Sequence, residues 1–149
     1  MKYPGSSVRI LVCGGRSFSD SFIVSSTLNV LTHGYDNITI IHGGATGADE
    51  LADVWASRRG ATVEKYPADW SLGKAAGPIR NRLMLREGDP SIVVAFAGGR
   101  GTEDMVKQAT KKNYGMHILV LRVQCCPAGV TGGCPHQRPK PIRIEEDHG

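Results

Sequence analysis

The chain has 149 residues, and its 18 basic and 14 acidic side chains give a formal net charge of +4. This length suits one ordinary domain and is too short for two domains with separate cores. A modest positive charge suits anionic ligands in general. No basic helix or aromatic–basic alternation is present, so nucleic acid is the less favoured partner and a small anionic ligand is expected.

Neither a signal peptide nor a membrane span is predicted. The first four residues lead directly into a strand-like segment, and no apolar run reaches the length of a membrane span. Cys13 falls in a predicted strand, whereas Cys125, Cys126 and Cys134 are crowded near the C-terminus. This is not the spacing of a disulfide framework, so we predict a cytoplasmic protein without membrane partners.

The first two strands are short apolar runs that end in glycine pairs. Residues 8–13 form the first run, and residues 38–41 form the second. Between them, Ser19 and Asp20 provide a helix start, and apolar residues follow at helical spacing up to Gly34. The spacing of the apolar residues therefore changes from that of a strand to that of a helix and back to that of a strand.

The second strand is followed by another predicted helix and a more polar strand. Thr46 is expected to cap this helix, with Asp49 three residues later completing a capping box. The helix ends at Gly60. Residues 62–66 then form a third strand, and its polar character places it nearer an edge of the sheet.

The second half of the chain repeats the alternation. Residues 67–78 are predicted as a long loop, of the kind that is often functional. A helix from about Ile79 to Arg86 follows, and residues 91–96 are the clearest buried strand. A helix from Thr102 to about Tyr114 and a strand over 117–123 complete the pattern.

Strands that alternate with helices, each strand nearly continuous in apolar residues, predict a parallel sheet covered on both faces. We expect a Rossmann-like, doubly wound α/β domain over residues 1–123, with strand order 3-2-1-4-5. In this order the first and fourth strands are neighbours, and ligands bind in the crevice at that switch point. Residues 124–149, rich in Cys, Pro and Gly, are predicted as an irregular tail.

Three predicted strands end in glycine-rich loops. Named by the strand that each follows, they are the first loop (Gly14-Gly15-Arg16), the second loop (Gly43-Gly44-Ala45-Thr46-Gly47) and the fourth loop (Gly98-Gly99-Arg100-Gly101-Thr102). Glycine lets backbone amides approach a ligand without an intervening Cβ. A helix that begins directly afterwards points unpaired N–H groups and the positive end of its dipole at the same place. None of the loops matches the Walker or dinucleotide fingerprint, but together they predict a phosphate-binding site at one edge of the sheet.

The ordered set of motifs resembles a known group of proteins. The segments concerned are Ser17-Phe18-Ser19-Asp20 after the first loop, His42 to Asp49, Ala68-Asp69-Trp70, Ala76 to Met84, and Gly98 to Thr102. Over about residues 8–123 they look like the YspA/YpsA-related branch of the SLOG superfamily, which also holds the LOG phosphoribohydrolases and the DprA DNA-processing proteins. The resemblance implies a Rossmann-like fold, a nucleotide or nucleotide-derived ligand, and a homodimer.

The LOG enzymes split a nucleoside 5′-monophosphate into base and ribose 5-phosphate, and they carry two motifs that can be compared with this chain. Their Arg-Lys-x-x-Met motif contains a catalytic arginine, which corresponds to Arg80 here, and Asn81 stands in place of the lysine. Their Pro-Gly-Gly-x-Gly-Thr-x-x-Glu motif contains a catalytic glutamate. Here Ala97 replaces the proline and Met105 replaces the glutamate. The resemblance thus leaves three alternatives: N-glycosidic hydrolysis, a non-catalytic nucleotide sensor, and a DprA-like binder of single-stranded DNA.

The carboxylates next to the loops have two interpretations each. Glu103 and Asp104, beside the position of the missing glutamate, either serve the sugar in catalysis or simply favour a helix N-terminus. Asp49 either accepts a ribose hydroxyl or completes the helix cap. With Arg80, Glu103 and Asp104 are the candidate catalytic residues.

The remaining candidates are assigned by side-chain chemistry. A planar guanidinium binds phosphate through two hydrogen bonds, so Arg16, Arg80 and Arg100 are candidate ligand residues. Asp69 is a further candidate, whereas Trp70 is assigned to the core or to a dimer interface rather than to base stacking. His42 and Cys13 are expected to be packing residues. Cys125, Cys126, Cys134 and His136 lack the Cys-x-x-Cys spacing of zinc sites, so no metal or cofactor is predicted.

Overall fold

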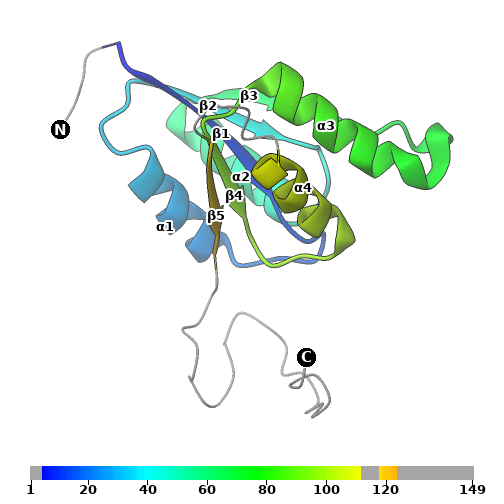
Figure 1. Ribbon diagram of the computed structural model, residues 1–149. Helices are drawn as coiled ribbons and strands as arrows, with labels where there is room; N and C mark the ends of the chain where they lie inside the picture. Colours follow the sequence, from blue (N-terminus) through cyan, green and yellow to red (C-terminus); the bar gives the residue numbers. More distant parts are fainter. Residues whose placement is uncertain (1–4, 112–117, 124–149) are drawn as a thin grey trace, which may run out of the picture.

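A computed structural model describes residues 5–111 and 118–123 (Figure 1). In chain order the elements are β1 (Ser7–Cys13), α1 (Ser21–Leu31), β2 (Asn37–His42), α2 (Ala48–Arg59), β3 (Thr62–Lys65), the 3₁₀ helix η1 (Trp70–Ala75), α3 (Ala76–Gly88), β4 (Ile92–Ala95), α4 (Arg100–Lys111) and β5 (Leu119–Arg122). The predicted tail over 124–149, with its three cysteines and His136, lies outside the described residues. In the described ranges no helix is long and apolar enough to cross a membrane.

The five strands form one parallel sheet in the order β3-β2-β1-β4-β5. In the centre, Leu11 of β1 stands opposite Ile41 of β2 and Val93 of β4. This confirms the predicted α/β doubly wound topology and places the more polar β3 at an edge. Because all strands run in one direction, the loops that follow them emerge at the same edge of the sheet. We call this edge, where the C-terminal ends of the strands lie, the rim of the sheet.

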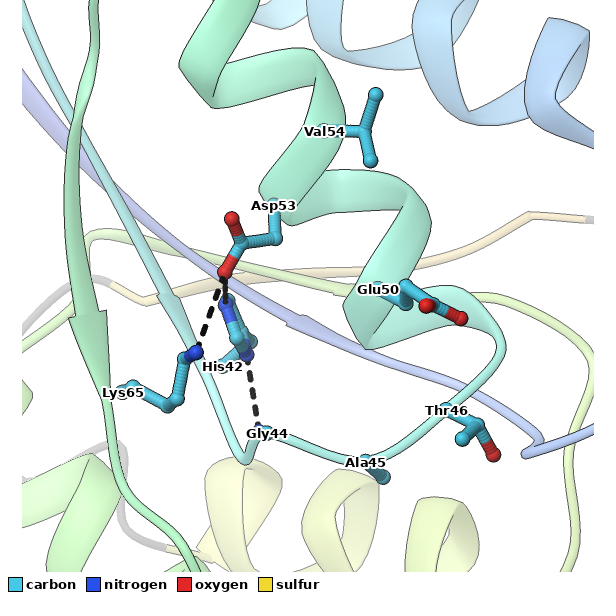
Figure 2. A pocket seen from close by; sticks show the side chains of 8 residues that line it. All are labelled: His42, Gly44, Ala45, Thr46, Glu50, Asp53, Val54 and Lys65. Atoms are coloured by element: carbon cyan, nitrogen blue, oxygen red, sulfur yellow. Dashed lines mark hydrogen bonds and ion pairs between the residues drawn. The ribbon is translucent and has the colours of Figure 1, made fainter.

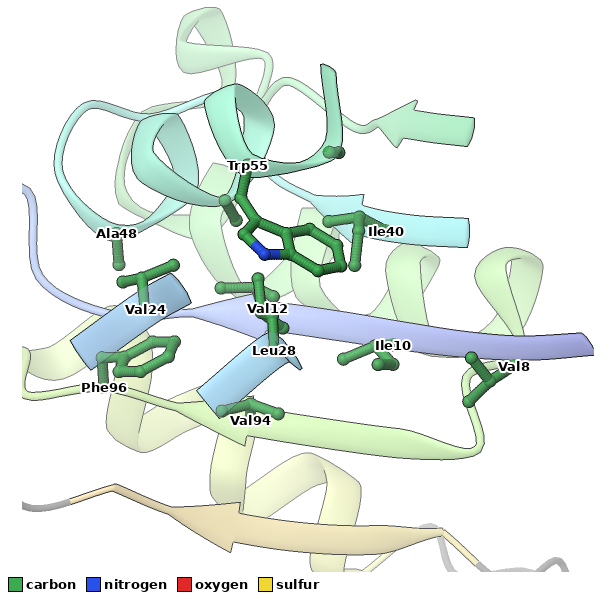
Figure 3. Packing of buried hydrophobic residues seen from close by; sticks show 12 residues of the cluster. Val8, Ile10, Val12, Val24, Leu28, Ile40, Ala48, Trp55, Val94 and Phe96 are labelled. Carbon is green, nitrogen blue, oxygen red and sulfur yellow. The ribbon is translucent and has the colours of Figure 1, made fainter. Parts of the chain in front are cut away.

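The core lies on both faces of the sheet because successive residues of β1 point to opposite sides. Ile10 and Val12 are buried on one face beneath α1 and α2 (Figure 3). Leu11 and Cys13 are buried on the other face against α3 and α4. Fully burying an aliphatic side chain contributes roughly 1.5–3 kcal/mol, so the two clusters hold the rim of the sheet in place.

Cys13 is a packing residue, as its position in a predicted strand indicated. Its side chain is buried in the second core cluster. Burial, with a smaller contribution from the negative charge of Asp49, raises the pKa of the thiol from 9.0 to about 12. Because the thiolate is the nucleophilic form, this raised pKa disfavours nucleophilic chemistry at Cys13.

The start of α1 is as predicted, but the start of α2 is not. Asp20 is the N-cap of α1 and accepts a hydrogen bond from the Ile23 amide at 3.0 Å. The predicted capping box of Thr46 and Asp49 is wrong, because Gly47 is the N-cap of α2. The Thr46 hydroxyl instead donates to the Arg16 carbonyl at 3.1 Å. The loop before α2 packs on the first glycine loop, and this contact takes the hydroxyl away from the helix.

Two further predicted boundaries differ from the structure. Residues 67–78 are not a continuous loop, because η1 occupies part of them and α3 begins at Ala76 rather than near Ile79. Pro78 is the third residue of α3, where amides have no helical acceptor and a missing N–H has no cost. Likewise α4 begins at Arg100, two residues before the predicted Thr102, and its predicted end near Tyr114 lies outside the described residues.

Candidate functional site

The three glycine loops meet at the rim of the sheet. The Gly15 amide donates to the Ala97 carbonyl at 2.8 Å, and the Ala48 amide donates to the Gly15 carbonyl at 3.2 Å. A Cβ at Gly47 would collide with backbone atoms of Gly15 and Arg16. The first loop therefore touches both of the others, so the predicted ligand-binding segments converge and Gly47 is required by that close approach.

The amides of the second loop are bonded to side chains of the protein itself. Those of Gly43 and Ala45 donate to Oδ2 of Asp49 at 3.1 and 3.2 Å. The Gly44 amide donates to Nδ1 of His42 at 2.9 Å. The Asp49 carboxylate thus takes the place that a bound anion takes in a loop of successive amides, and these three amides are not available to a phosphate.

His42 is buried and fully hydrogen-bonded, as expected of a core residue. It is 1% exposed at the end of β2, and its Nε2 lies 2.7 Å from Oδ2 of Asp53 (Figure 2). Because Nδ1 accepts a hydrogen bond from the Gly44 amide, Nε2 is the ring nitrogen that donates a hydrogen bond to Asp53. Lys65 Nζ lies 3.8 Å from the same carboxylate oxygen. This chain of contacts holds the second loop against α2 and β3.

A small hollow lies beside the second loop. Its volume is about 280 Å³, and it opens between the start of α2 and the end of β3 (Figure 2). The lining residues are His42, Gly44, Ala45, Thr46, Glu50, Asp53, Val54 and Lys65. Two of the predicted ligand-binding residues, Gly44 and Thr46, are among them.

The buried Asp49 and the half-buried Arg80 form the electrostatic centre of the second loop. Burial raises the pKa of Asp49, and this effect is opposed by the hydrogen bond from the Ala45 amide and by the charge of Arg80. Burial also lowers the pKa of Arg80, and the negative charge of Asp49 partly opposes this by raising it. Nη1 of Arg80 donates to the Gly43 carbonyl at 2.9 Å. The predicted phosphate-binding arginine is therefore anchored on the second loop.

The fourth loop is different, because the N-terminus of α4 is open. The first amide of this helix with a carbonyl partner is that of Glu103, which donates to the Gly99 carbonyl at 3.0 Å. Among residues 5–111 and 118–123, no acceptor is found for the amides of Gly99, Arg100 and Gly101. A Cβ at Gly99 or Gly101 would have no atom within 4 Å. These amides are accessible to a ligand.

A larger hollow runs along one side of α4, from the loop before its N-terminus to Lys111. Its volume is about 660 Å³. The lining residues are Gly98, Gly99, Arg100, Glu103, Asp104, Val106, Lys107, Thr110, Lys111 and Arg122. Four of these are cationic and two are acidic, so the charge of the wall favours an anion. Five of the lining residues, Gly98 to Arg100 with Glu103 and Asp104, were predicted for the site.

Both acidic residues of the larger hollow have partners. The Glu103 carboxylate accepts two hydrogen bonds from Arg122, at 2.8 and 2.9 Å. These bonds hold the pKa of Glu103 below its usual value. Asp104 accepts from Asn81 at 2.9 Å and from Gln108 at 2.7 Å. Both carboxylates are therefore ordered by neighbouring side chains.

Asn81, the residue after Arg80 in α3, connects this helix to α4 by hydrogen bonds. The Asn81 side chain is 3% exposed and donates to the Gly101 carbonyl at 3.1 Å as well as to Asp104. Thr102, which was predicted to bind ligand, is also buried. Met105 is fully buried in the second core cluster, so the position that corresponds to the catalytic glutamate of the LOG enzymes faces the core.

The remaining candidates lie at an exposed edge of the rim. The Arg16 guanidinium stacks on the Trp70 ring, 5.2 Å from its centroid. Trp70 is 55% exposed, so a core role for it is wrong, whereas an interface role stays a prediction. Asp69 accepts hydrogen bonds from the amide and hydroxyl of Ser71, which lower its pKa and begin η1.

Three cations of the larger hollow were missed by sequence reasoning. Lys107 and Lys111 follow Glu103 at intervals of four residues, and this spacing places all three on one face of a helix. That signal was available in the sequence. Arg122 carries no comparable signal, because nothing local to β5 indicates which loop its side chain reaches. In the described segments no group of three or more His, Cys, Asp or Glu side chains is arranged to hold a metal ion.

Comparisons with known proteins show the family to which the chain belongs. Residues 8–73 match the model of the "YspA, cpYpsA-related SLOG family". The matched range contains the first two glycine loops, and the fourth loop lies beyond it. The chain is also 38% identical over 112 residues to "Gene 61 protein" of Mycobacterium phage D29, an alignment that covers 69% of this chain and 89% of the phage protein. The chain belongs to the YspA, cpYpsA-related SLOG family.

Proposed function

We propose that the chain binds a phosphate-bearing nucleotide or nucleotide-derived ligand, with the phosphate at the N-terminus of α4. The observation that carries this proposal is the set of open amides of Gly99, Arg100 and Gly101, which face no acceptor among the described residues. They lie beside a hollow of about 660 Å³, and cavities of roughly 300–1,000 Å³ hold small organic ligands.

The groups at the N-terminus of α4 favour a phosphate. Amides at a helix N-terminus donate toward an anion, and the helix dipole adds a favourable field. Arg100, which is exposed and lines the hollow, supplies a guanidinium on the same loop. Hydrogen bonds of this charged kind contribute roughly 1.5–3 kcal/mol each, so a few of them are enough for measurable affinity.

Family membership supports the nucleotide part of the proposal, because the SLOG family is associated with nucleotide-related binding or processing. The second glycine loop then acts as a support rather than as a phosphate cradle, since Asp49 and His42 occupy its amides. Arg80, which bonds to the carbonyl of that loop, would reach the ligand from the side of the rim with its remaining N–H groups.

A bound nucleotide leaves two candidate functions: hydrolysis of its N-glycosidic bond, or a module that holds the nucleotide intact. Hydrolysis of an N-glycosidic bond needs a carboxylate that serves the sugar. Glu103 is bound to Arg122, Asp104 is bound to Asn81 and Gln108, and residue 105 is a buried methionine. These contacts favour a sensor or sequestering protein over a hydrolase.

The test is to incubate the full chain with nucleoside monophosphates and ADP-ribose-like compounds, and to measure binding by calorimetry and products by mass spectrometry. Arg100→Gln should weaken binding, whereas Arg58→Gln, an exposed arginine outside both hollows, should not. Intact retained nucleotide supports the sensor, and released base supports the hydrolase. Binding of oligonucleotides alone, with strong salt dependence, would overturn both in favour of a DNA binder.

A further inference from the structure

We infer that Arg122 is a second anion-binding residue of the larger hollow, and that Glu103 is its internal competitor, which the ligand displaces. This inference rests on the proposed function. It concerns a residue outside every glycine loop, at the end of an edge strand. It assigns to Arg122 a contact with the phosphate and to Glu103 a role in selecting ligands by their charge.

The sheet topology brings Arg122 to the same end of the sheet as the open amides at the N-terminus of α4. It is the last residue of β5 and stands opposite Ala95, the last residue of β4. The chain leaves Ala95 directly into the loop that contains Gly98 and Gly99. All of these loop residues and Arg122 line one hollow, so a phosphate on the amides of α4 lies on the same side as the guanidinium.

The contact that Arg122 now makes is the one it would make with a phosphate. Two parallel N–H···O bonds to Glu103, at 2.8 and 2.9 Å, match the fork of a guanidinium to two oxygens of one anion. The side chains of Arg122 and Glu103 are 53% and 58% exposed. An ion pair this exposed contributes little to folding stability, so a ligand can displace the carboxylate without disturbing the fold.

Glu103 occupies the region where a ligand anion would lie. It is in the first turn of α4, where negative charge interacts favourably with the helix dipole. Because Arg122 lowers its pKa, Glu103 is ionised at neutral pH. A ligand must therefore present more negative charge than one carboxylate. The chemical class expected is a dianionic phosphate, and neutral nucleosides should be rejected.

The experiment uses the full chain, with inorganic pyrophosphate as the probe and titration calorimetry as the readout. Glu103→Gln should bind pyrophosphate about tenfold more tightly, and Arg122→Gln about tenfold less tightly. In the Arg122→Gln background, Glu103→Gln should have little further effect, because the two residues act on one contact. Arg122→Lys, which keeps the charge and loses the fork, should fall between wild type and Arg122→Gln.

The matched control is Glu87→Gln. Glu87 is an exposed acid paired with Arg86 at 3.2 Å, outside the lining of both hollows. An equal gain of affinity in Glu87→Gln and Glu103→Gln would reduce the effect to net charge and overturn the inference. So would a gain from Glu103→Gln that persists without Arg122.

The two proposals fail in different ways. If wild type binds pyrophosphate or a nucleotide and the Glu103 and Arg122 variants match it, only the competitor inference fails. If neither wild type nor Glu103→Gln binds pyrophosphate or any nucleotide, the proposed function fails with it. Urea unfolding of each variant shows that a loss of binding is not a loss of folding.

Discussion

The second and fourth glycine loops look alike in sequence and differ in what their amides contact. In the second loop, Asp49 and His42 accept the amides of Gly43, Gly44 and Ala45. In the fourth loop, the amides before Glu103 have no acceptor in the described parts of the chain, and a hollow of about 660 Å³ lies beside them. One loop is closed by the protein's own anion and the other is open.

The difference shows that a glycine-rich turn after a parallel strand is not by itself a phosphate site. Glycine at 47 is needed because the loops pack backbone to backbone, whereas glycine at 99 leaves space unfilled. The first is a requirement of folding and the second is available for binding. Substitutions at the two loops should therefore separate stability from affinity.

The largest effect is expected for Gly47→Ala. Gly47 has φ +79°, and a Cβ there would meet backbone atoms of Gly15 and Arg16. We expect a loss of roughly 3 kcal/mol or more in the free energy of unfolding, measured by urea denaturation. Gly99→Ala, with open space around the new methyl group, should change it by less than about 0.5 kcal/mol. Equal losses at the two positions would contradict the comparison.

Asp49→Ala should be the next most damaging change. It leaves the buried amide of Gly43 and the part-buried amide of Ala45 without their acceptor, and a buried amide without an acceptor costs about 1–3 kcal/mol. Glu103→Ala removes an exposed carboxylate from an ion pair and should leave the urea midpoint near that of wild type. Added phosphate or formate should raise the melting temperature of Asp49→Ala more than that of wild type, because the emptied loop can accept an anion.

Gly99→Ala should lower affinity without lowering stability. Its methyl group would enter the larger hollow beside the open amides, and we expect about tenfold weaker nucleotide binding, equivalent to ~1.4 kcal/mol. Gly77→Ala is the matched control, because a Cβ there also meets nothing within 4 Å and lies outside both hollows. Unchanged calorimetric affinity in Gly99→Ala would remove the α4 amides from the site.

The pH dependence of the free energy of unfolding should report on Asp49, which closes the second loop. Burial raises the folded-state pKa of Asp49 above its ordinary value of 3.8, so the folded protein retains this proton to higher pH than the unfolded chain does. The stability from this group is present at low pH and is lost as pH rises through the folded pKa. Relative to Asp49→Asn, wild type should thus become less stable as pH increases. Parallel pH profiles of urea unfolding would show that Asp49 is not perturbed.

The smallest effect is expected for Thr46→Ala. Its exposed hydroxyl donates to the Arg16 carbonyl and does not cap α2, so the cost should be about 0.5 kcal/mol or less. Asp20→Ala removes a true cap of α1 and should cost about 1 kcal/mol. If thermal unfolding ranks the two in the opposite order, the second loop caps its helix after all.

Much of the fold could be predicted because its signals are local. The apolar run over 8–13 and the helical spacing that ends at Gly34 reflect burial on one or two faces, and each can be read within a few residues. Helix starts were less predictable. Thr46 has the right residue type for a cap, but its hydroxyl is taken by a carbonyl 30 positions earlier in the chain.

The sequence by itself determined the strand order, the edge of the sheet where the glycine loops gather, and the family. Only the tertiary structure decided which loop is open. Asp49 and His42 close the second loop because α2 and the end of β2 pack side by side, and Arg122 reaches the fourth loop because β5 pairs with β4. Hydrogen-bond acceptors are supplied by elements that meet in space, so the chain's local pattern specifies the turns but not their partners.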